Sequence, residues 1–383
     1  MTTAQSDAAY DALALLAEYR PKSPFFFASP RGTIATEGEY FAVPSAADLP
    51  AALQGVLDLC RDDGHEDPIV VGAVPFDSSA PPRLTVPVRT HRAGRLPMRL
   101  APPAATAAAD ARTVEVPSGA AYAEGVRRAV ARLRAGELDK VVLARALDVT
   151  TETAVDIGLL LRRLAARDPS GYTFAVDLGA GTLVGSSPEL LVSRHGDVVT
   201  ANPLAGSLPR NPDPIEDFGQ ARALLSSRKD RREHALVAEA VAESLRPYCR
   251  ELRVPAEPSL VRTHAMWHLS TVVTGRVVDP AVSSLTLGTA LHPTPAVCGT
   301  PTGDARAAIA EYEDFDRGFY TGVVGWENDA GDGEWVVALR CAVVEGNSAR
   351  LYAGAGIVAD SDPDAELAET TAKFRTMLAG LGL

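Results

Sequence analysis

A lysine and a glutamate stand in the sequence where charged side chains are unusual. Lys140 opens the apolar run KVVLARALDVT, and Glu189 follows a proline and precedes three apolar residues. Loss of water lowers the pKa of a lysine ammonium group, so Lys140 in its neutral form could act as a general base. Burial raises the pKa of a carboxyl group, so Glu189 could hold a proton and donate it to a leaving oxygen. The pair would suit an elimination or a substitution. Each residue alone could equally be a solvated side chain at a strand end.

Carboxylates recur at helical spacing in two further segments. In KDRREHALVAEAV, Asp230 lies one turn before Glu233, and in PDAELAETTAKFRTM, Glu366, Glu369 and Lys373 share one face at i, i+3 and i+7. Mg²⁺ prefers oxygen ligands, so four carboxylates on two helices could hold it. The alternative is two solvated faces of surface ion pairs. No histidines pair at the spacing of a zinc site, which disfavours zinc.

Two glycine-containing strings and one arginine complete the candidate chemistry. NPLAGS (202–207) and YAGAGIV (352–358) would let backbone N–H groups approach an anion, although neither has the spacing of a P-loop or of a dinucleotide-binding motif. Arg340 lies among apolar residues in WVVALRCAVV, where its guanidinium could bind a carboxylate through two parallel hydrogen bonds. Ordinary glycine turns and a structural buried ion pair remain the alternatives.

Composition limits the partners and the compartment. The formal net charge of −12 repels phosphate backbones, and the one compact basic run, 89–99, is interpreted as a solvated loop or edge, so no nucleic acid is expected. Four scattered cysteines form no C-x-x-C pair, which fits a reducing cytoplasm. The N-terminal apolar run is too short for a signal peptide, and no stretch approaches the ~20 apolar residues of a membrane span. We expect a cytoplasmic monomer that binds no membrane.

The elements that must position these residues are clearest after residue 115. The periodicity predicts helices and strands at the following places: helices over 122–134, 155–166, 226–252 and 363–378, strands over 140–150, 172–176, 182–185 and 268–277, and a three-strand antiparallel meander over 318–358. Before that point we expect strands within 23–38 and 67–77, a helix over 46–60 and a low-complexity loop over 101–120.

Antiparallel strands with helices outside them predict a layered α+β architecture, not a doubly wound parallel sheet. We expect a single large domain. In it, residues 1–115 would form the N-terminal part of the fold, and residues 116–383 would form the catalytic region.

Nine strings within 116–383 together resemble the chorismate-utilising enzymes, the family of anthranilate, aminodeoxychorismate, isochorismate and salicylate synthases. They are KVVLAR, SSPELL, NPLAGS, DRREHALV, WHL, LHPTPAVCG, GFYTGVVGW, WVVALRCA and AGAGIV followed by ELAETTAKF. Residues 1–115 match the family only weakly. The resemblance implies the layered fold of anthranilate synthase component I, chorismate as the substrate and Mg²⁺ as the cofactor.

The resemblance also implies a role for each candidate residue. Glu233 and Glu369 are similar to the family's magnesium ligands, with Asp230 and Glu366 supporting them through water. At position 230 this sequence has aspartate, whereas the resemblance leads us to expect glutamate there. Substrate contacts are implied for a further set: Gly206, Ser207, His268, Ala296, Tyr320, Arg340, Gly354 and Lys373.

Within the family, a lysine at the position of Lys140 marks the members that use water as the nucleophile. Ala296, where others have threonine, is similar to the isochorismate-forming members, whereas Tyr320 is also seen in salicylate synthases. The resemblance implies that Glu189 protonates the departing C4 hydroxyl of chorismate while Lys140 activates water for attack at C2, which gives isochorismate reversibly.

Other functions stay open at this point. A salicylate synthase would add elimination of pyruvate, an amine-forming synthase would use ammonia, and an inactive relative would serve as a regulatory subunit. The strings are closer to siderophore-type enzymes, but menaquinone or another salicylate-derived product could equally lie downstream.

Overall fold

The computed structural model describes residues 11–103 and 110–383, so the first ten residues and part of the expected 101–120 loop lie outside it. Its helices are α1 Ala12–Glu18, α2 Leu49–Asp62, α3 Gly119–Arg134, α4 Ile157–Arg167, α5 Pro214–Ser226, α6 Arg228–Leu245, α7 Ser284–Leu291, α8 Thr302–Tyr312 and α9 Pro363–Leu381. Its strands are β1 Phe25–Ala28, β2 Thr33–Ala42, β3 Ile69–Val74, β4 Arg83–Ala93, β5 Ala111–Val116, β6 Lys140–Thr151, β7 Tyr172–Asp177, β8 Thr182–Ser187, β9 Leu190–His195, β10 Val198–Asn202, β11 Leu204–Pro209, β12 Cys249–Arg253, β13 Ser259–Arg262, β14 Met266–Ser270, β15 Val273–Val277, β16 Gly299–Thr300, β17 Val323–Asn328, β18 Gly333–Val337, β19 Cys341–Glu345 and β20 Ser348–Ile357.

Every strand pairing in the described residues is antiparallel. The large sheet runs β12-β15-β10-β9-β18-β17-β3-β4-β2-β1-β7-β8-β19-β20-β6, and the far edge of β6 pairs with β16 near its start and with β5 further on. A second, three-stranded sheet has the order β11-β14-β13. Strands from before residue 116 thus join the same sheet as later ones.

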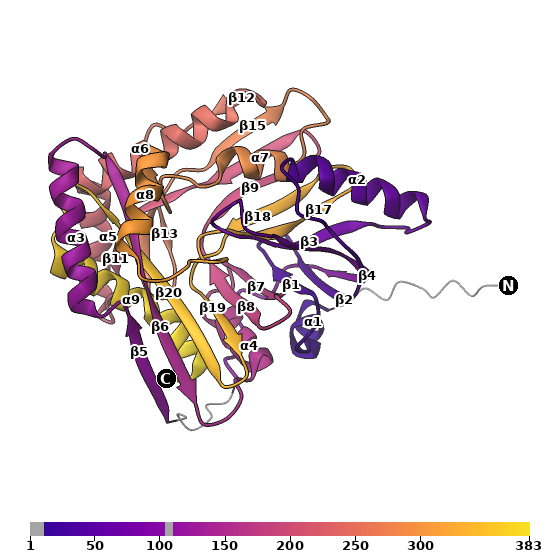
Figure 1. Ribbon diagram of the computed structural model, residues 1–383, viewed down its shortest axis with the longest axis horizontal. Helices are drawn as coiled ribbons and strands as arrows, with labels where there is room; N and C mark the ends of the chain where they lie inside the picture. The colour runs from indigo at the N-terminus through magenta and orange to yellow at the C-terminus, as the bar shows by residue number, and fades with distance from the viewer. Residues whose placement is uncertain (1–10, 104–109) are drawn as a thin grey trace.

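The long sheet folds back so that its two halves pack face to face. Their shared core contains Phe27 of β1, Phe174 of β7 and Val324 of β17. One outer face is covered by α2, α6 and α7, and the other by α1, α4 and α9 (Figure 1). Helices α3 and α8 pack against β6 and β20 in a further cluster. The predicted layered α+β architecture is therefore confirmed.

The predicted helix over 226–252 is too long at its C-terminal end. Helix α6 ends at Leu245, and the chain then forms strand β12, which pairs with β15. Pro247 explains the early end, because proline lacks the N–H that a helix needs and restricts the residue before it. The apolar spacing could not separate the helix from the strand that follows.

Two predicted strands are each divided in the structure. The segment 268–277 forms β14 in the small sheet and β15 in the large one. The predicted meander over 318–358 is two hairpins, β17–β18 and β19–β20, because the chain breaks at Arg340, where φ is +48°. A non-glycine residue rarely adopts this conformation, and it turns Arg340 out of the strand in which it was predicted to lie.

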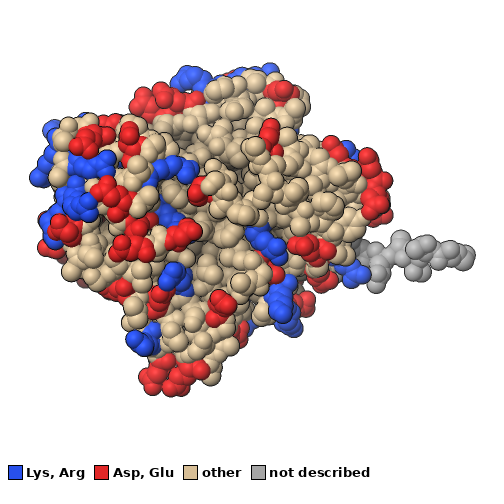
Figure 2. Space-filling model, in the orientation of Figure 1, with Lys and Arg blue, Asp and Glu red and all other residues tan. Residues whose placement is uncertain are grey.

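The low-complexity loop expected over 101–120 is wrong at its C-terminal end. Residues Ala111–Val116 form β5, which pairs along β6, and Ser118 caps helix α3 by accepting a hydrogen bond from the backbone N–H of Ala121. Helices α1, α5, α7 and α8 were not predicted. Within the described residues no helix is long and apolar enough to cross a membrane. On the face shown in Figure 2, basic side chains are interspersed with acidic ones and form no single basic surface.

Candidate active site

All fourteen residues singled out in the sequence line one pocket, with an empty volume of about 770 Å³ that includes open solvent at its mouth. Its walls come from β6, β11, β14, β20, α6 and α9 and from the loops before β9, β16, β17 and β19. The residues are Lys140, Glu189, Gly206, Ser207, Asp230, Glu233, His268, Ala296, Tyr320, Arg340, Gly354, Glu366, Glu369 and Lys373. The structure thus brings them together from segments far apart in the chain, and their individual roles stay a prediction.

Lys140 is the first residue of β6 and is only 1% exposed. Its Nζ lies 2.8 Å from Glu233 Oε1, so the candidate base is ion-paired with a candidate metal ligand. Nζ must leave this contact before it can approach a water molecule beside the substrate. The expected burial of Lys140 is confirmed, and the alternative of a solvated strand-end lysine is wrong.

Glu189 lies in the short connection between β8 and β9 and is 3% exposed. Burial raises the pKa of its carboxyl group to about 7, although a backbone hydrogen bond from Leu204 and the charges of Lys140 and Arg340 partly oppose the shift. A carboxyl group with this pKa holds a proton for much of the time near neutral pH. The raised pKa expected from the sequence is confirmed, and the alternative of a glutamate in water is wrong.

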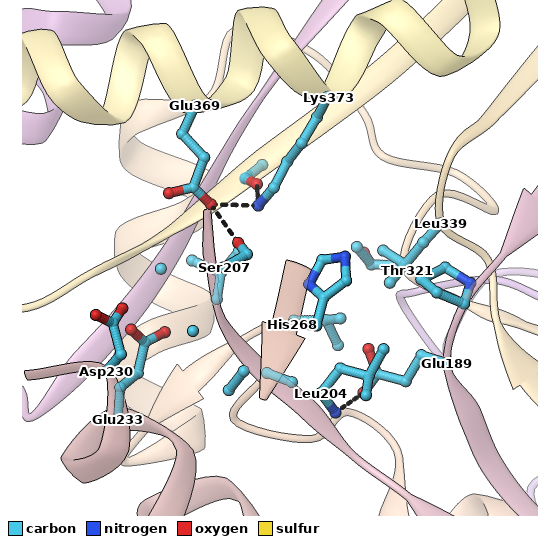
Figure 3. A pocket seen from close by; sticks show the side chains of 18 of the residues that line it. Glu189, Leu204, Ser207, Asp230, Glu233, His268, Thr321, Leu339, Glu369 and Lys373 are labelled. Carbon is cyan, nitrogen blue, oxygen red and sulfur yellow. Dashed lines mark hydrogen bonds and ion pairs between the residues drawn. The ribbon is translucent and has the colours of Figure 1, made fainter. Parts of the chain in front are cut away.

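Four carboxylates meet at the end of the pocket where α6 approaches α9. In Figure 3, Asp230 and Glu233 project from α6, and Glu369 projects from α9 into the same side of the pocket. Burial, reinforced by the charge of Glu369, raises the pKa of Glu366 to about 7. Burial also raises the pKa of Asp230, and the nearby Glu233 adds to the shift. The carboxylates therefore repel one another in a poorly solvated space.

Lysines offset part of this repulsion. Lys373 Nζ lies 2.6 Å from Glu369 Oε1, to which Ser207 Oγ also donates a hydrogen bond of 3.2 Å. Burial pushes the pKa of Glu369 upward, yet Lys373 and Ser207 hold it below its ordinary value. Lys229 lies 3.6 Å from Glu366 Oε1 at the mouth. In this structure the carboxylates are thus neutralised by ammonium groups or by protons.

The acidic end of the pocket fits Mg²⁺ by its donor chemistry. The donors are carboxylate oxygens alone, which suit magnesium and not zinc, and their mutual repulsion is the kind that a divalent cation relieves. The side chains are not closed around an ion: the described residues contain no cluster of three or more His, Cys, Asp or Glu arranged to hold a metal.

The other end of the pocket presents groups suited to an anion. The Nη2 atom of Arg340 is buried without a hydrogen-bond partner in the described part of the chain, as is Nε2 of His268. Burial, with the charges of Arg340 and Lys373, lowers the pKa of His268 well below its ordinary value, so its imidazole is neutral. Lys373 Nζ donates to the carbonyl of Gly354 at 2.7 Å. An unsatisfied guanidinium nitrogen in a pocket indicates a ligand oxygen as its missing partner.

Comparison with known protein families identifies the family of this chain. A family model described as chorismate binding enzyme matches residues 87–382. The chain belongs to the chorismate-binding enzymes.

This chorismate-binding enzyme is closely similar to named relatives over nearly its whole length. It is 49% identical over 382 residues to the isochorismate synthase DhbC of Bacillus subtilis, with 96% of each chain covered. It is 43% identical over 366 residues to the vibriobactin-specific isochorismate synthase of Vibrio cholerae, with 94% of this chain and 92% of the relative covered. The crystal structure of DhbC from Bacillus anthracis matches it with a TM-score of 0.94 and 49% identity, covering 97% and 100% of the two chains. The predicted family and fold are confirmed.

Several residues that line the pocket of this chorismate-binding enzyme were missed in the sequence, among them Lys229, Thr321 and Gly356. Lys229 directly precedes Asp230, so the helical carboxylate pattern could have included it. Gly356 lies in the AGAGIV string, but its importance is spatial. A Cβ atom at Gly356 would lie 2.5 Å from Glu233 Oε1 and 2.9 Å from Lys140 Cε, contacts that no sequence pattern reveals.

Proposed function

We propose that this chorismate-binding enzyme is an isochorismate synthase, which converts chorismate to isochorismate reversibly by expelling the C4 hydroxyl and adding water at C2. The observation that carries the proposal is the pair Lys140 and Glu189, both buried and both lining one pocket with the unsatisfied Arg340. The names of relatives at 43% and 49% identity support it.

Glu189 is the general acid. Its burial keeps a proton on the carboxyl group near neutral pH, and that proton passes to the C4 oxygen of chorismate, which leaves as water. Lys140 is the general base, and its Nζ takes a proton from the water that bonds to C2. One water enters, one leaves, and the ring double bonds shift between the two carbons, so the reaction is balanced without another reactant.

The substrate is bound and oriented at the end of the pocket that suits an anion, here called the anionic end, by Arg340, Tyr320 and Lys373. The free guanidinium nitrogen of Arg340 suits a carboxylate oxygen, and the neutral imidazole of His268 supplies a polar contact without adding charge. The backbone of Gly206 and Gly354, the hydroxyl of Ser207 and the small side chain of Ala296 complete the substrate wall. Holding the ring in one orientation contributes to rate because it removes motional freedom before the reaction.

Glu233 and Glu369 would hold Mg²⁺, with Asp230 and Glu366 supporting it through water. The ion would supply positive charge for the ring carboxylate of chorismate. The same two carboxylates form ion pairs with Lys140 and Lys373, at 2.8 and 2.6 Å.

A salicylate synthase remains the alternative within the family, and it differs by releasing pyruvate. We also propose that the enzyme acts as a cytoplasmic monomer and that its product feeds siderophore synthesis, as the name of the vibriobactin-specific relative suggests. Its four cysteines are free and buried, which fits a reducing compartment.

Incubation of chorismate with the enzyme and Mg²⁺ tests the proposal, with both isomers and pyruvate quantified over time. We expect an equilibrium mixture of chorismate and isochorismate without pyruvate. Pyruvate formed at the rate of chorismate loss would assign salicylate synthase instead.

A further inference from the structure

Strand β6, which begins at Lys140, lacks a neighbouring strand for part of one edge. Strand β16 pairs with it at residues 140 and 141, and β5 pairs with it from residue 146 onward. Between these two strands the N–H of Val142 still donates to the backbone carbonyl of Cys298 at 2.8 Å, whereas two further backbone groups of β6 are bonded by side chains. Arg317 Nη2 donates to the carbonyl of Val142 at 2.7 Å, and the N–H of Ala144 donates to Glu313 Oε1 at 2.8 Å.

Glu313 and Arg317 form a buried ion pair that fills this gap. Arg317 Nε donates to Glu313 Oε2 at 2.8 Å and Nη2 to Oε1 at 2.6 Å, and the two side chains are 2% and 3% exposed. A buried ion pair is weak evidence for stability, because removing two charges from water offsets much of their attraction. A contribution to stability therefore does not by itself explain why this ion pair lies at the edge of β6.

The remaining donors of Arg317 reach two more parts of the pocket wall. Nη1 donates to the carbonyl of Val297 at 2.8 Å and to Thr321 Oγ1 at 3.2 Å. With the bonds to Glu313 and Val142, all five N–H donors of the guanidinium are used. Val142, Val297 and Thr321 all line the pocket, whereas neither Arg317 nor Glu313 does.

Thr321 is held in a strained conformation at this point. Its φ is +59°, which is unfavourable for a β-branched residue, and it is 1% exposed. Such a residue persists only where its surroundings over-determine it, and strained residues concentrate at functional sites. Here the restraints are Arg317 on the hydroxyl and a backbone hydrogen bond from Thr321 N to the carbonyl of Ala338.

We propose that Arg317, oriented by Glu313, is a positioning residue that fixes three walls of the pocket relative to one another. These walls are the start of β6, the segment around Val297 and the strained turn at Thr321. The inference rests on the proposed function only for its readout, the turnover of chorismate. A lysine at 317 has three donors on one atom and cannot make the five bonds of the planar fork.

The test compares Arg317→Lys with Arg194→Lys. Arg194 is also a buried arginine that donates to two backbone carbonyls, those of Gly196 and Val282, but it does not line or brace the pocket. We expect both variants to lower Tm, and only Arg317→Lys to lower kcat/KM, by about 10²-fold, as expected for a small misplacement of reacting groups. Unchanged kcat/KM in Arg317→Lys, or an equal loss in Arg194→Lys, would overturn the proposal.

A double-mutant cycle with Thr321→Gly separates positioning from a general loss of structure. Glycine removes both the strain and the hydroxyl that Arg317 contacts, so the two changes act on the same turn. We expect the double variant to lose little more kcat/KM than Arg317→Lys alone, and fully additive losses would contradict the coupling.

If Arg317→Lys does not fold, Glu313→Gln replaces it in the test. We then expect a smaller loss of kcat/KM, and a wild-type value of kcat/KM would overturn the proposal. If the proposed function is wrong, the wild-type enzyme will form no isochorismate. That result is distinguishable from a failure of the positioning role, which concerns only the variants.

Discussion

Lys140 Nζ and Glu233 Oε1 lie 2.8 Å apart and form a buried ion pair between the proposed base and a proposed magnesium ligand. Gly356 makes this contact possible, because any side chain there would occupy the space of the pair. The proposed base and the acidic end of the pocket are thus coupled, so the effects of substitutions at Lys140 and Glu233 should not be additive.

The first prediction concerns Gly356. Gly356→Ala would place a Cβ atom 2.5 Å from Glu233 Oε1 and force the Lys140–Glu233 pair apart. We expect kcat to fall by about 10²-fold while the protein remains folded. Gly219→Ala is the matched control, since a Cβ there meets nothing within 4 Å on helix α5; it should keep full activity and gain about 0.4–1 kcal/mol of stability. Equal activity of the two variants would contradict this role of Gly356.

The second prediction concerns the metal. Glu233→Gln and Glu369→Gln should each abolish turnover and weaken Mg²⁺ binding measured by calorimetry, because each removes a charged oxygen ligand. Excess EDTA should inactivate the wild type, and added Mg²⁺ should restore it. Glu257→Gln, at a surface glutamate whose side chain is 70% exposed, is the control and should bind Mg²⁺ normally. Full wild-type activity in EDTA would remove the magnesium assignment.

The third prediction concerns pH. Because burial raises the pKa of Glu189 from 4.5 to about 7, the protonated acid is lost as the pH rises through about 7, and the alkaline limb of kcat should reflect this loss. The same shift has a consequence for stability. The buried, protonated form is favoured by the fold, so the contribution of Glu189 is complete below pH 4.5 and is lost as the pH rises through about 7.

Glu189→Gln tests both effects. It should lower kcat by about 10²–10⁴-fold and remove the alkaline limb from the residual activity. It should also flatten the dependence of the unfolding free energy on pH between 4.5 and about 7. An alkaline limb that persists in this variant would assign it to another group.

Much of this site could be predicted from the sequence, because its residues stand in local patterns. The carboxylates of α6 and α9 have helical spacing, and Lys140 and Glu189 interrupt apolar runs. What escaped prediction depends on long-range contacts. Nothing near Arg340 in the sequence marks its positive φ, and nothing near Glu313 or Arg317 indicates that their side chains bond the backbone of β6. The division of 268–277 between two sheets is likewise set by partners that are distant in the chain.

The kcat of Lys140→Ala, measured in ammonia-free buffer beside calorimetric titration with chorismate, tests the central claim most directly. If Lys140 activates water, kcat should fall by about 10²–10⁴-fold while chorismate still binds, because Arg340 and the rest of the anionic end remain in place. A variant that binds chorismate and turns it over at nearly the wild-type kcat would show that water is activated by another group, and the proposed mechanism would be wrong.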